Sequence, residues 1–548
     1  MLEENFVKYI ENSLRKNWDL PAFNDYGGES FRYSDVAIQI SRLHEFLKQA
    51  GVNQQDKVAL VGKNSARWCV TYLAIVSYGA VIVPVLPEFK PDDLHHILNH
   101  SDAMMVFADD AIVKTIVNEQ LTGIKAVFSV GDYHLSSSKD NVIAAAFERS
   151  SLMKPLQESD LTPEKFSLPE VPNENLALIS YTSGTAGFVK GVMLLHNSLA
   201  ANVRYAQNNM PLKSGDNIVS FLPLAHAFGA AFEFLFPFSL GCSITILTKT
   251  PSPQIVMQAF QEVKPALVLS VPLVIEKIFR KQIQPVINKW YMKVLLVIPG
   301  VKTKIHKKIC DKLVGAFGGQ FHEIVIGGAP FNKQVERFFR KIKFPFTVGY
   351  GMTECGPLIS YQNWRDTQIG ASGQIVDTLQ LKIDSPDPEN IPGEIMVKGD
   401  NVMLGYYKNP ELTAEIIDAN KWLHTGDLGL VDKEGRIYIK GRSKSMILGP
   451  NGKNIYPDEI ENRLNNRHGI GESLIVSRND KLVALIYPDQ DMVAKEKLTH
   501  EDLEKLFEHH RKAVNHQLPH FISIAQVEIQ DKEFAKTPKR SIKRFLYS

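Results

Sequence analysis

Residues 181–192, with the sequence YTSGTAGFVKGV, decide how the rest of the chain is interpreted. They follow the apolar run 176–179 (LALI) and precede a second short apolar run. Backbone N–H groups and hydroxyls in a loop this rich in glycine, serine and threonine can surround phosphate oxygens, and Lys190 adds a positive charge. The P-loop spacing G-x-x-x-x-G-K-[ST] does not occur in it. A solvated linker is the alternative, but the position between two apolar strands argues against one.

Around this loop, short apolar runs alternate with helical patterns through roughly the first 440 residues. Lys57–Val61 precedes a helical stretch that runs to Tyr78, and Val81–Val85 follows it. Further on, 322–326 leads through two glycines into the amphipathic segment 331–342. Strands that alternate with helices predict layered, mostly parallel sheets covered by helices on both faces. The predicted fold class is α/β.

The C-terminal part of the chain follows another pattern. Segments 458–466 and 501–516 are predicted helices, and 473–477 with 481–487 predict a hairpin that turns at Asn479-Asp480. The polar stretch 440–453 (KGRSKSMILGPNGK) is the predicted linker. We therefore predict a large N-terminal domain over residues 1–443 and a small α+β domain over 444–548.

The bulk composition excludes several classes of protein. The 548 residues carry 62 Lys+Arg against 60 Asp+Glu, a net charge of +2 that does not favour nucleic acid as a partner. The four cysteines lack disulfide or metal spacing, which fits a reducing cytoplasm. The N-terminus has no signal-like apolar core, and the longest apolar stretches, such as 294–301, are shorter than the ~20 residues that span a bilayer. We expect a cytoplasmic protein; the oligomeric state is left open.

Five further motifs follow the phosphate-binding candidate or lie near it. They are 221–229 (FLPLAHAFG), 327–330 (GGAP), 350–357 (YGMTECGP), 422–428 (WLHTGDL) and 441–444 (GRSK). In this order, and over nearly the whole chain, the set resembles the adenylate-forming superfamily of acyl-CoA synthetases, peptide-synthetase adenylation domains and luciferases. Any one motif could occur by chance, but the ordered set is highly specific.

The resemblance implies ATP, Mg²⁺ and coenzyme A as ligands and assigns roles to individual residues. Tyr350 would stack on adenine, Thr353 would bind the α-phosphate, and Glu354 would hold Mg²⁺, a cation that prefers oxygen ligands. Asp427 would accept hydrogen bonds from the ribose with help from Arg442, and His226 would position the acid. The remaining predicted nucleotide-binding residues are Thr182, Ser183, Gly184, Thr185 (also a metal ligand), Gly187, Lys190, Gly328, Ala329 and Gly351.

The same resemblance implies a two-step reaction. The carboxylate attacks the α-phosphorus of ATP and expels pyrophosphate, and the coenzyme A thiol then attacks the acyl-adenylate and releases AMP. The small C-terminal domain of the family rotates between the steps, and the hinge position falls on Lys444, inside the predicted linker.

Three positions depart from the family pattern. Ala186 and Val189 replace the threonine and proline that are usual in the phosphate loop. More seriously, the family's C-terminal catalytic lysine aligns with Ser541, and a hydroxyl cannot supply its charge. Lys539, two residues earlier, would point to the same face of an extended segment. We hypothesise that Lys539 substitutes; the alternative is that the basic tail is only a solvated surface.

The nature of the acid is indicated by 270–279 (SVPLVIEKIF) and 452–457 (GKNIYP), which resemble segments of bacterial long-chain fatty acyl-CoA synthetases. The predicted substrate is a medium- or long-chain fatty acid. Two alternatives stay open: transfer to a carrier protein in place of coenzyme A, and a catalytically weakened protein that binds ATP or acyl-AMP. A further hypothesis is peripheral contact of the amphipathic N-terminus and basic tail with the inner face of a membrane.

Overall fold

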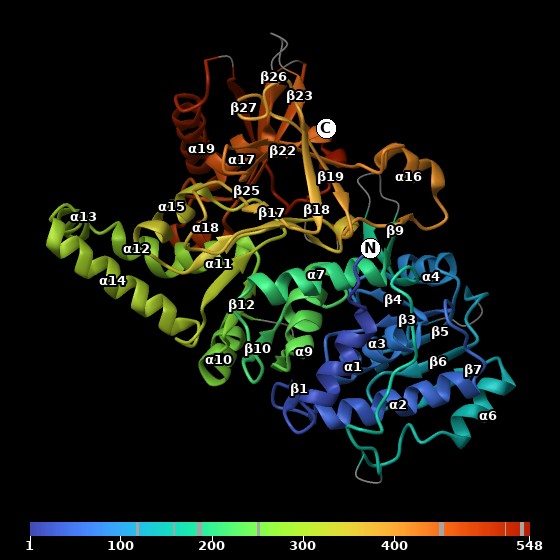
Figure 1. Cartoon of the computed structure of the whole chain (residues 1–548). Helices are drawn as coiled ribbons and strands as arrows, with labels where there is room; N and C mark the ends of the chain where they lie inside the picture. Colours follow the sequence, from blue (N-terminus) through green and yellow to red (C-terminus); the bar gives the residue numbers. More distant parts are fainter. Residues whose placement is uncertain are drawn as a thin grey trace.

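The computed structural model describes residues 1–548 except 117–119, 157–158, 184–188, 249–251, 449–453, 480, 521, 538–541 and 548. Its largest element is an eight-stranded sheet, in which β3, β4, β5, β6 and β8 run parallel and β7, β9 and β20 pair antiparallel at the edges (Figure 1). In spatial order the strands are β20 (Gly405–Tyr406), β9 (Val189–Leu195), β8 (Leu176–Ser183), β4 (Val81–Val85), β3 (Lys57–Val61), β5 (Ala103–Ala108), β6 (Ala126–Ser129) and β7 (Leu135–Ser138).

Both faces of this sheet are buried, as the continuous apolar strands predict. Along β3, Val58 and Leu60 join one hydrophobic core, whereas Ala59 and Val61 join another on the opposite face. Helix α4 (Pro91–His100) covers the second face. The helices that contribute to the first are α1 (Phe6–Lys16), α2 (Tyr33–Gln49), α3 (Ala66–Tyr78), α6 (Asn141–Arg149), α7 (His196–Asn209) and α9 (Phe236–Leu240).

Two smaller sheets complete the alternating part of the fold. One has the order β10 (Asn217–Ser220), β11 (Ser243–Ile246), β1 (Pro21–Asp25) and β2 (Ser30–Arg32). The other is the parallel set β12 (Leu267–Ser270), β13 (Glu323–Ile326) and β14 (Phe346–Val348). The helical segments around them are α10 (Pro253–Val263), α11 (Pro272–Ile278), η4 (Phe279–Ile283), α12 (Gln284–Ile287), α13 (Trp290–Leu295), α14 (Pro299–Ala316) and α15 (Lys333–Lys341).

The alternation in the sequence predicts mostly parallel sheets up to about residue 440, but the parallel pairing ends at β14. After β14 the strands of the next two sheets pair antiparallel, an arrangement that needs no helical crossover between neighbours. The first group is β15 (Tyr350–Gly351), β16 (Leu358–Tyr361) and β17 (Gln374–Ile375). The second is β18 (Leu379–Asp384), β19 (Gly393–Gly399), β21 (Leu423–Val431) and β22 (Ile437–Arg442), with α16 (Pro410–Ile416) before β21.

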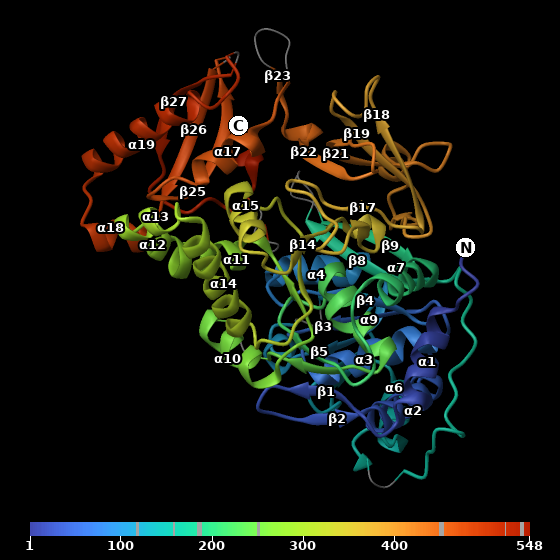
Figure 2. The same cartoon turned by 60° about the vertical axis from the view of Figure 1, so that its left-hand side comes forward.

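The C-terminal segment has hydrophobic cores of its own, which begin at Ile455. Figures 1 and 2 show it as an orange and red unit at the opposite end of the molecule from the blue N-terminal sheet. The predicted hairpin is present, and Asn479 has the positive φ of 50° that a tight turn needs. The unit contains β23 (Ile447–Leu448), β24 (Asn454–Ile455), α17 (Pro457–Asn465), β25 (Ile470–Arg478), β26 (Lys481–Pro488), α18 (Gln490–Glu496), α19 (His500–Asn515) and β27 (Ile524–Ile529).

Candidate active site

Tyr350, Asp427 and Arg442 form the first cluster of predicted site residues. Strand pairing between β21 and β22 places Asp427 opposite Arg442, and Arg442 Nε lies 3.1 Å from Asp427 Oδ1. The Tyr350 phenol donates a hydrogen bond of 2.7 Å to Asp427 Oδ2. Burial raises the pKa of the Asp427 carboxyl, and the Arg442 cation partly opposes that rise. Each carboxylate oxygen already has one partner and retains a lone pair for a further donor.

Glu354 and Lys190 meet at a residue that the sequence analysis did not single out, Tyr406. Glu354 lies in the short 3-10 turn Thr353–Cys355, and its Oε1 accepts a hydrogen bond of 2.8 Å from the Tyr406 phenol. Lys190 Nζ lies 5.0 Å from the centre of the same ring. Burial lowers the pKa of Lys190, the nearby Lys444 cation lowers it further, and Glu354 opposes both effects. The cluster therefore places a carboxylate and two lysines in one electrostatic neighbourhood.

The β8–β9 hairpin presents Lys190 to this cluster. Thr182, at the end of β8, is the register partner of Lys190, and the chain between residues 183 and 189 connects the two strands. The next residue, Gly191, sits where a Cβ would come within 2.8 Å of Ile179 Cγ2 and 3.3 Å of the Tyr181 ring. A glycine fits there because these side chains leave no room for a Cβ. The chain that follows β20 is held at this edge by a hydrogen bond of 2.7 Å from Tyr407 N to Gly191 O.

His226 and the GGAP turn are brought together by Phe228. His226 precedes the short helix α8 (Ala227–Gly229), and its backbone N–H donates to Pro223 O at 3.0 Å. A Cβ on Gly327 would lie 3.1 Å from Phe228 Cζ, so the ring packs directly on the turn. The predicted acid segment thus adjoins the predicted nucleotide segment. In that turn Gly328 has a φ of +85°, and Ala329 is exposed.

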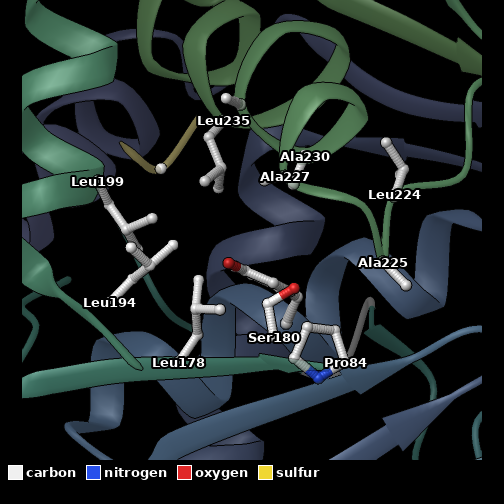
Figure 3. A pocket seen from close by; sticks show the side chains of 13 residues that line it. Pro84, Leu178, Ser180, Leu194, Leu199, Leu224, Ala225, Ala227, Ala230 and Leu235 are labelled. Atoms are coloured by element: carbon white, nitrogen blue, oxygen red, sulfur yellow. The ribbon is translucent and has the colours of Figure 1, made fainter. Parts of the chain in front are cut away.

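Residues of α8 and of the π-helical turn η3 (Ala230–Leu235) line a small apolar cavity (Figure 3). Leu178, Leu199 and Leu235 surround it from three different elements, and Ser180 projects toward the same space. The free space is about 20 Å³, enough for roughly one water molecule. Tyr72 also lines the cavity, and its buried hydroxyl has no partner among the described residues. In this conformation the cavity is too small to hold an acyl chain.

Glu233, inside η3, is a buried carboxyl that the sequence analysis missed. Its Oε2 accepts hydrogen bonds from Ser220 Oγ at 3.1 Å, Phe221 N at 3.0 Å and Leu222 N at 2.9 Å. It therefore braces the start of the 221–229 segment from behind. Burial raises the pKa of Glu233 to about 8. The only signal in the sequence is one acidic residue inside the apolar run 230–238 (AAFEFLFPF).

The other predicted site residues divide into two groups. Gly351 in β15 approaches the backbone closely, because a Cβ there would lie 2.2 Å from Pro357 O, and Thr353 begins the turn that carries Glu354. Ser183 is described only as the last residue of β8. Predicted residues outside the described part of the chain are Gly184, Thr185, Gly187 and Lys539, together with the departures Ala186 and Ser541.

Comparison with known proteins identifies the family of the chain. The family model described as AMP-binding enzyme matches residues 10–407. The chain belongs to the AMP-binding enzyme family. A long-chain-fatty-acid–CoA ligase of Escherichia coli is 28% identical over 497 residues, or 86% of this chain and 82% of that protein. The peroxisomal long chain acyl-CoA synthetase 7 of Arabidopsis thaliana is 29% identical over 542 residues, or 92% and 76% of the two chains.

Among solved structures, the anthranilate CoA ligase AuaEII in complex with anthranoyl-AMP has a TM-score of 0.79 at 19% identity. The match covers 100% of this chain and 97% of that one, so the fold is shared throughout. The predicted adenylate-forming family and α/β fold class are confirmed. As predicted, the chain belongs to a family of AMP-binding enzymes, and its Escherichia coli relative is by name an acid–CoA ligase.

Proposed function

We propose that this AMP-binding enzyme activates a medium- or long-chain fatty acid as the acyl-adenylate and transfers the acyl group to coenzyme A. The observation that carries the proposal is the apolar cavity behind α8, which adjoins the His226 segment. Its lining is mostly leucine and alanine, so it suits a hydrocarbon chain better than a polar or aromatic acid. The names of the Escherichia coli and Arabidopsis thaliana relatives support the same substrate class.

The nucleotide would lie between the two clusters of the candidate site. Asp427, with Arg442 beside it, would accept hydrogen bonds from the ribose hydroxyls, and Tyr350 would meet the adenine. Lys190 and the loop that precedes it would surround the phosphates. The partly lowered pKa of Lys190 reflects its burial, and anionic phosphate would restore the balance of charge around Lys190 and Lys444.

Glu354 fits the role of a Mg²⁺ ligand. Its carboxylate is half-buried beside the two lysines, and its Oε1 accepts the hydrogen bond from the Tyr406 phenol. No group of three or more acidic, histidine or cysteine side chains suited to a metal occurs in the described part of the chain, so phosphate oxygens would complete the coordination. Bound there, Mg²⁺ would neutralise charge on the phosphates of ATP.

In the first step, an oxygen of the substrate carboxylate would attack the α-phosphorus in line, and the bond to pyrophosphate would break. His226 would orient the carboxylate, and Thr353 would donate to the α-phosphate. In the second step, the thiol sulfur of coenzyme A would attack the acyl carbon, its proton would leave, and AMP would depart with the electron pair. Positioning and charge complementarity supply most of such catalysis.

We further propose that the domain boundary lies at 443/444 and that Lys444 is the hinge. Lys444 occupies the 3-10 turn η6 (Ser443–Ser445), between β22 and the first strand of the C-terminal unit. Contacts across the boundary are polar, such as the hydrogen bond of 2.5 Å from Arg280 Nη2 to Asn465 O. A polar interface of this kind separates more easily than a hydrophobic one. Lys444→Pro, which fixes φ, should slow one half-reaction at least ~10-fold more than the other.

Isotope exchange between pyrophosphate and ATP, measured with acids from acetate to palmitate, tests the proposal. Exchange that rises with chain length, followed by AMP release that depends on coenzyme A, is the expected result. AMP release that requires a carrier protein would favour the acyl-AMP ligase alternative. Absence of exchange with every acid would favour the ATP- or acyl-AMP-binding alternative and would mean that Ser541 cannot replace the family's lysine.

A second variant tests the role of Lys539. If Lys539 substitutes for the family lysine, Lys539→Ala will abolish exchange; unchanged rates would refute the substitution.

A further inference from the structure

Helices α12 and α13 and the start of α14 expose a group of large apolar side chains. Trp290 is 78% exposed and Val297 is 79% exposed, values far above those of ordinary apolar residues in this chain. Figure 1 shows these helices at the edge of the molecule, away from the central sheet. The set, called here the α13 patch, consists of Val286, Trp290, Tyr291, Val294, Val297 and Ile298.

The local sequence explains why these residues stay outside the core. Prolines at 285 and 299 divide the segment, so that α12 and α13 are each shorter than two turns and make little contact with the sheets. Trp290 and Val294 are four residues apart in α13 and therefore share one side of that helix, and the exposed Val297 and Ile298 lie in the turn between α13 and α14. The Trp290 and Tyr291 rings contact each other edge to face at 6.0 Å.

The charge around the patch is strongly one-sided. Between residues 281 and 310 there is no aspartate or glutamate, although the whole chain has a net charge of only +2. Four lysines on α14 are exposed, and none makes an ion pair within the described part of the chain: Lys302, Lys304, Lys307 and Lys308. The remaining lysines of this stretch are Lys281, Lys289 and Lys293.

We propose that the α13 patch is a docking site for the surface of an anionic lipid bilayer. Tryptophan and tyrosine prefer the boundary between headgroups and hydrocarbon, where the apolar ring is covered and the polar end stays wet. The valines and isoleucine would enter the outer acyl region, and the lysines would face the phosphates of anionic lipids. No helix in the described part of the chain is long and apolar enough to cross a membrane, so the contact is peripheral.

Two alternatives, a second copy of the chain as the partner and helix α1 as the membrane-binding surface, fit the observations less well. A symmetric contact with a second copy would bring the same lysines of both copies together across the two-fold axis, which costs free energy. The N-terminal helix α1 does not offer an apolar surface, because its apolar face (Phe6, Val7, Ile10 and Leu14) is buried in the core. The structure therefore does not support the hypothesis that the amphipathic N-terminal helix contacts the membrane, and the α13 patch is the surface proposed instead.

Co-sedimentation of the full chain with phosphatidylcholine vesicles, with and without phosphatidylglycerol, tests this docking site. We expect binding to the anionic vesicles that weakens as salt is raised. The Trp290→Ser, Val297→Ser variant and the Lys304→Glu, Lys307→Glu, Lys308→Glu variant should each bind at least ~10-fold more weakly. The control for the first is the double variant Val142→Ser, Ile391→Ser, which changes exposed apolar residues elsewhere. The control for the second is the triple variant Lys16→Glu, Lys48→Glu, Lys165→Glu, which changes exposed lysines elsewhere.

Tryptophan emission gives an independent measurement, because Trp290 is the exposed one of the five tryptophans and should shift to the blue on anionic vesicles. Equal binding by patch and control variants, or no binding by the wild type, would overturn the proposal. A dimer that the Trp290→Ser, Val297→Ser variant loses would instead identify an interface between copies. Pyrophosphate exchange with octanoate in the absence of vesicles should be unchanged in the patch variants, so failure of the proposed function and failure of the docking site are separable.

Discussion

The Tyr406 phenol donates a hydrogen bond of 2.8 Å to Glu354 Oε1, while Lys190 Nζ lies 5.0 Å from the centre of the same ring. One aromatic side chain thus touches both the predicted metal ligand and the predicted phosphate-binding lysine. Tyr406 lies in β20, a two-residue strand at the edge of the eight-stranded sheet beside β9. The placement of this edge strand therefore sets the relation between the anionic and cationic parts of the site.

Tyr406→Phe should weaken the use of Mg²⁺ without loss of the fold. The ring remains against Lys190, but Glu354 loses the hydrogen bond that orients it, at a cost of about 1 kcal/mol. The Mg²⁺ concentration that gives half-maximal pyrophosphate exchange should rise roughly fivefold. Tyr407→Phe is the matched control, because its hydroxyl bonds to Asp102 Oδ2 at 2.7 Å, outside the cluster. Identical Mg²⁺ dependence in both variants would contradict an orienting role.

Asp427→Asn should raise the KM for ATP. The Asp427 carboxylate accepts from the buried Tyr350 phenol and pairs with the Arg442 cation. An asparagine amide would place its NH₂ donor against one of these two donors, so that one interaction would be lost. Loss of a hydrogen bond to a charged group costs about 1.5–3 kcal/mol, so an increase of roughly 10- to 100-fold is expected in exchange assays with varied ATP. Asp377→Asn serves as the control, since its pair with Arg204 is exposed and contributes little. A similar KM in the two variants would argue against ribose binding at Asp427.

Much of the fold follows from local patterns in the sequence. Lys57–Val61 and Val81–Val85 are strands with the predicted bounds, because a strand buried on both faces is a continuous apolar run with clear ends. The antiparallel strands after Phe346–Val348 were not distinguished, because half-exposed strands such as Leu379–Asp384 have a weaker apolar pattern. The pairing of β19 with β21 also joins strands separated by residues 400–422, which contain β20 and α16.

The candidate site divides in the same way. Motifs identified Glu354 and Asp427, but Tyr406 carries no charge pattern, and its importance arises only when β20 reaches the edge of β9. Glu233 is hidden in an apolar run for the same reason. The apolar pattern of segment 294–301 predicts only that it is too short to cross a bilayer. Its exposure depends on the short helices around it, which the pattern does not predict. Tertiary placement, and not residue type, distinguishes such positions.

Gly191→Ala should destabilise the hairpin that presents Lys190. The added methyl would lie 2.8 Å from Ile179 Cγ2, and overpacking of this kind costs about 1–3 kcal/mol. Both the melting temperature and the exchange rate should therefore fall. Gly315→Ala is a contrasting variant within helix α14, where an added Cβ meets no atom within 4 Å. It should stabilise the protein by about 0.5–1 kcal/mol. A neutral Gly191→Ala variant would show that the Ile179 side chain can shift to admit the methyl group without cost.

Glu233→Gln should change how stability depends on pH. The folded pKa of about 8 lies above the ordinary value of 4.5, so the native state holds a proton that the unfolded chain releases. As pH rises from about 4.5 to 8, the free energy of unfolding of the wild type should fall by a few kcal/mol relative to Glu233→Gln, and the difference should be constant outside that window. Urea unfolding from pH 4 to 9 measures this difference in the free energy of unfolding.

Glu233→Ala, which removes the acceptor of Ser220, Phe221 and Leu222, should be less stable at every pH. Parallel curves for the wild type and Glu233→Gln would mean that the carboxyl is already ionised in the native state, where the three donors to Oε2 would stabilise the charge.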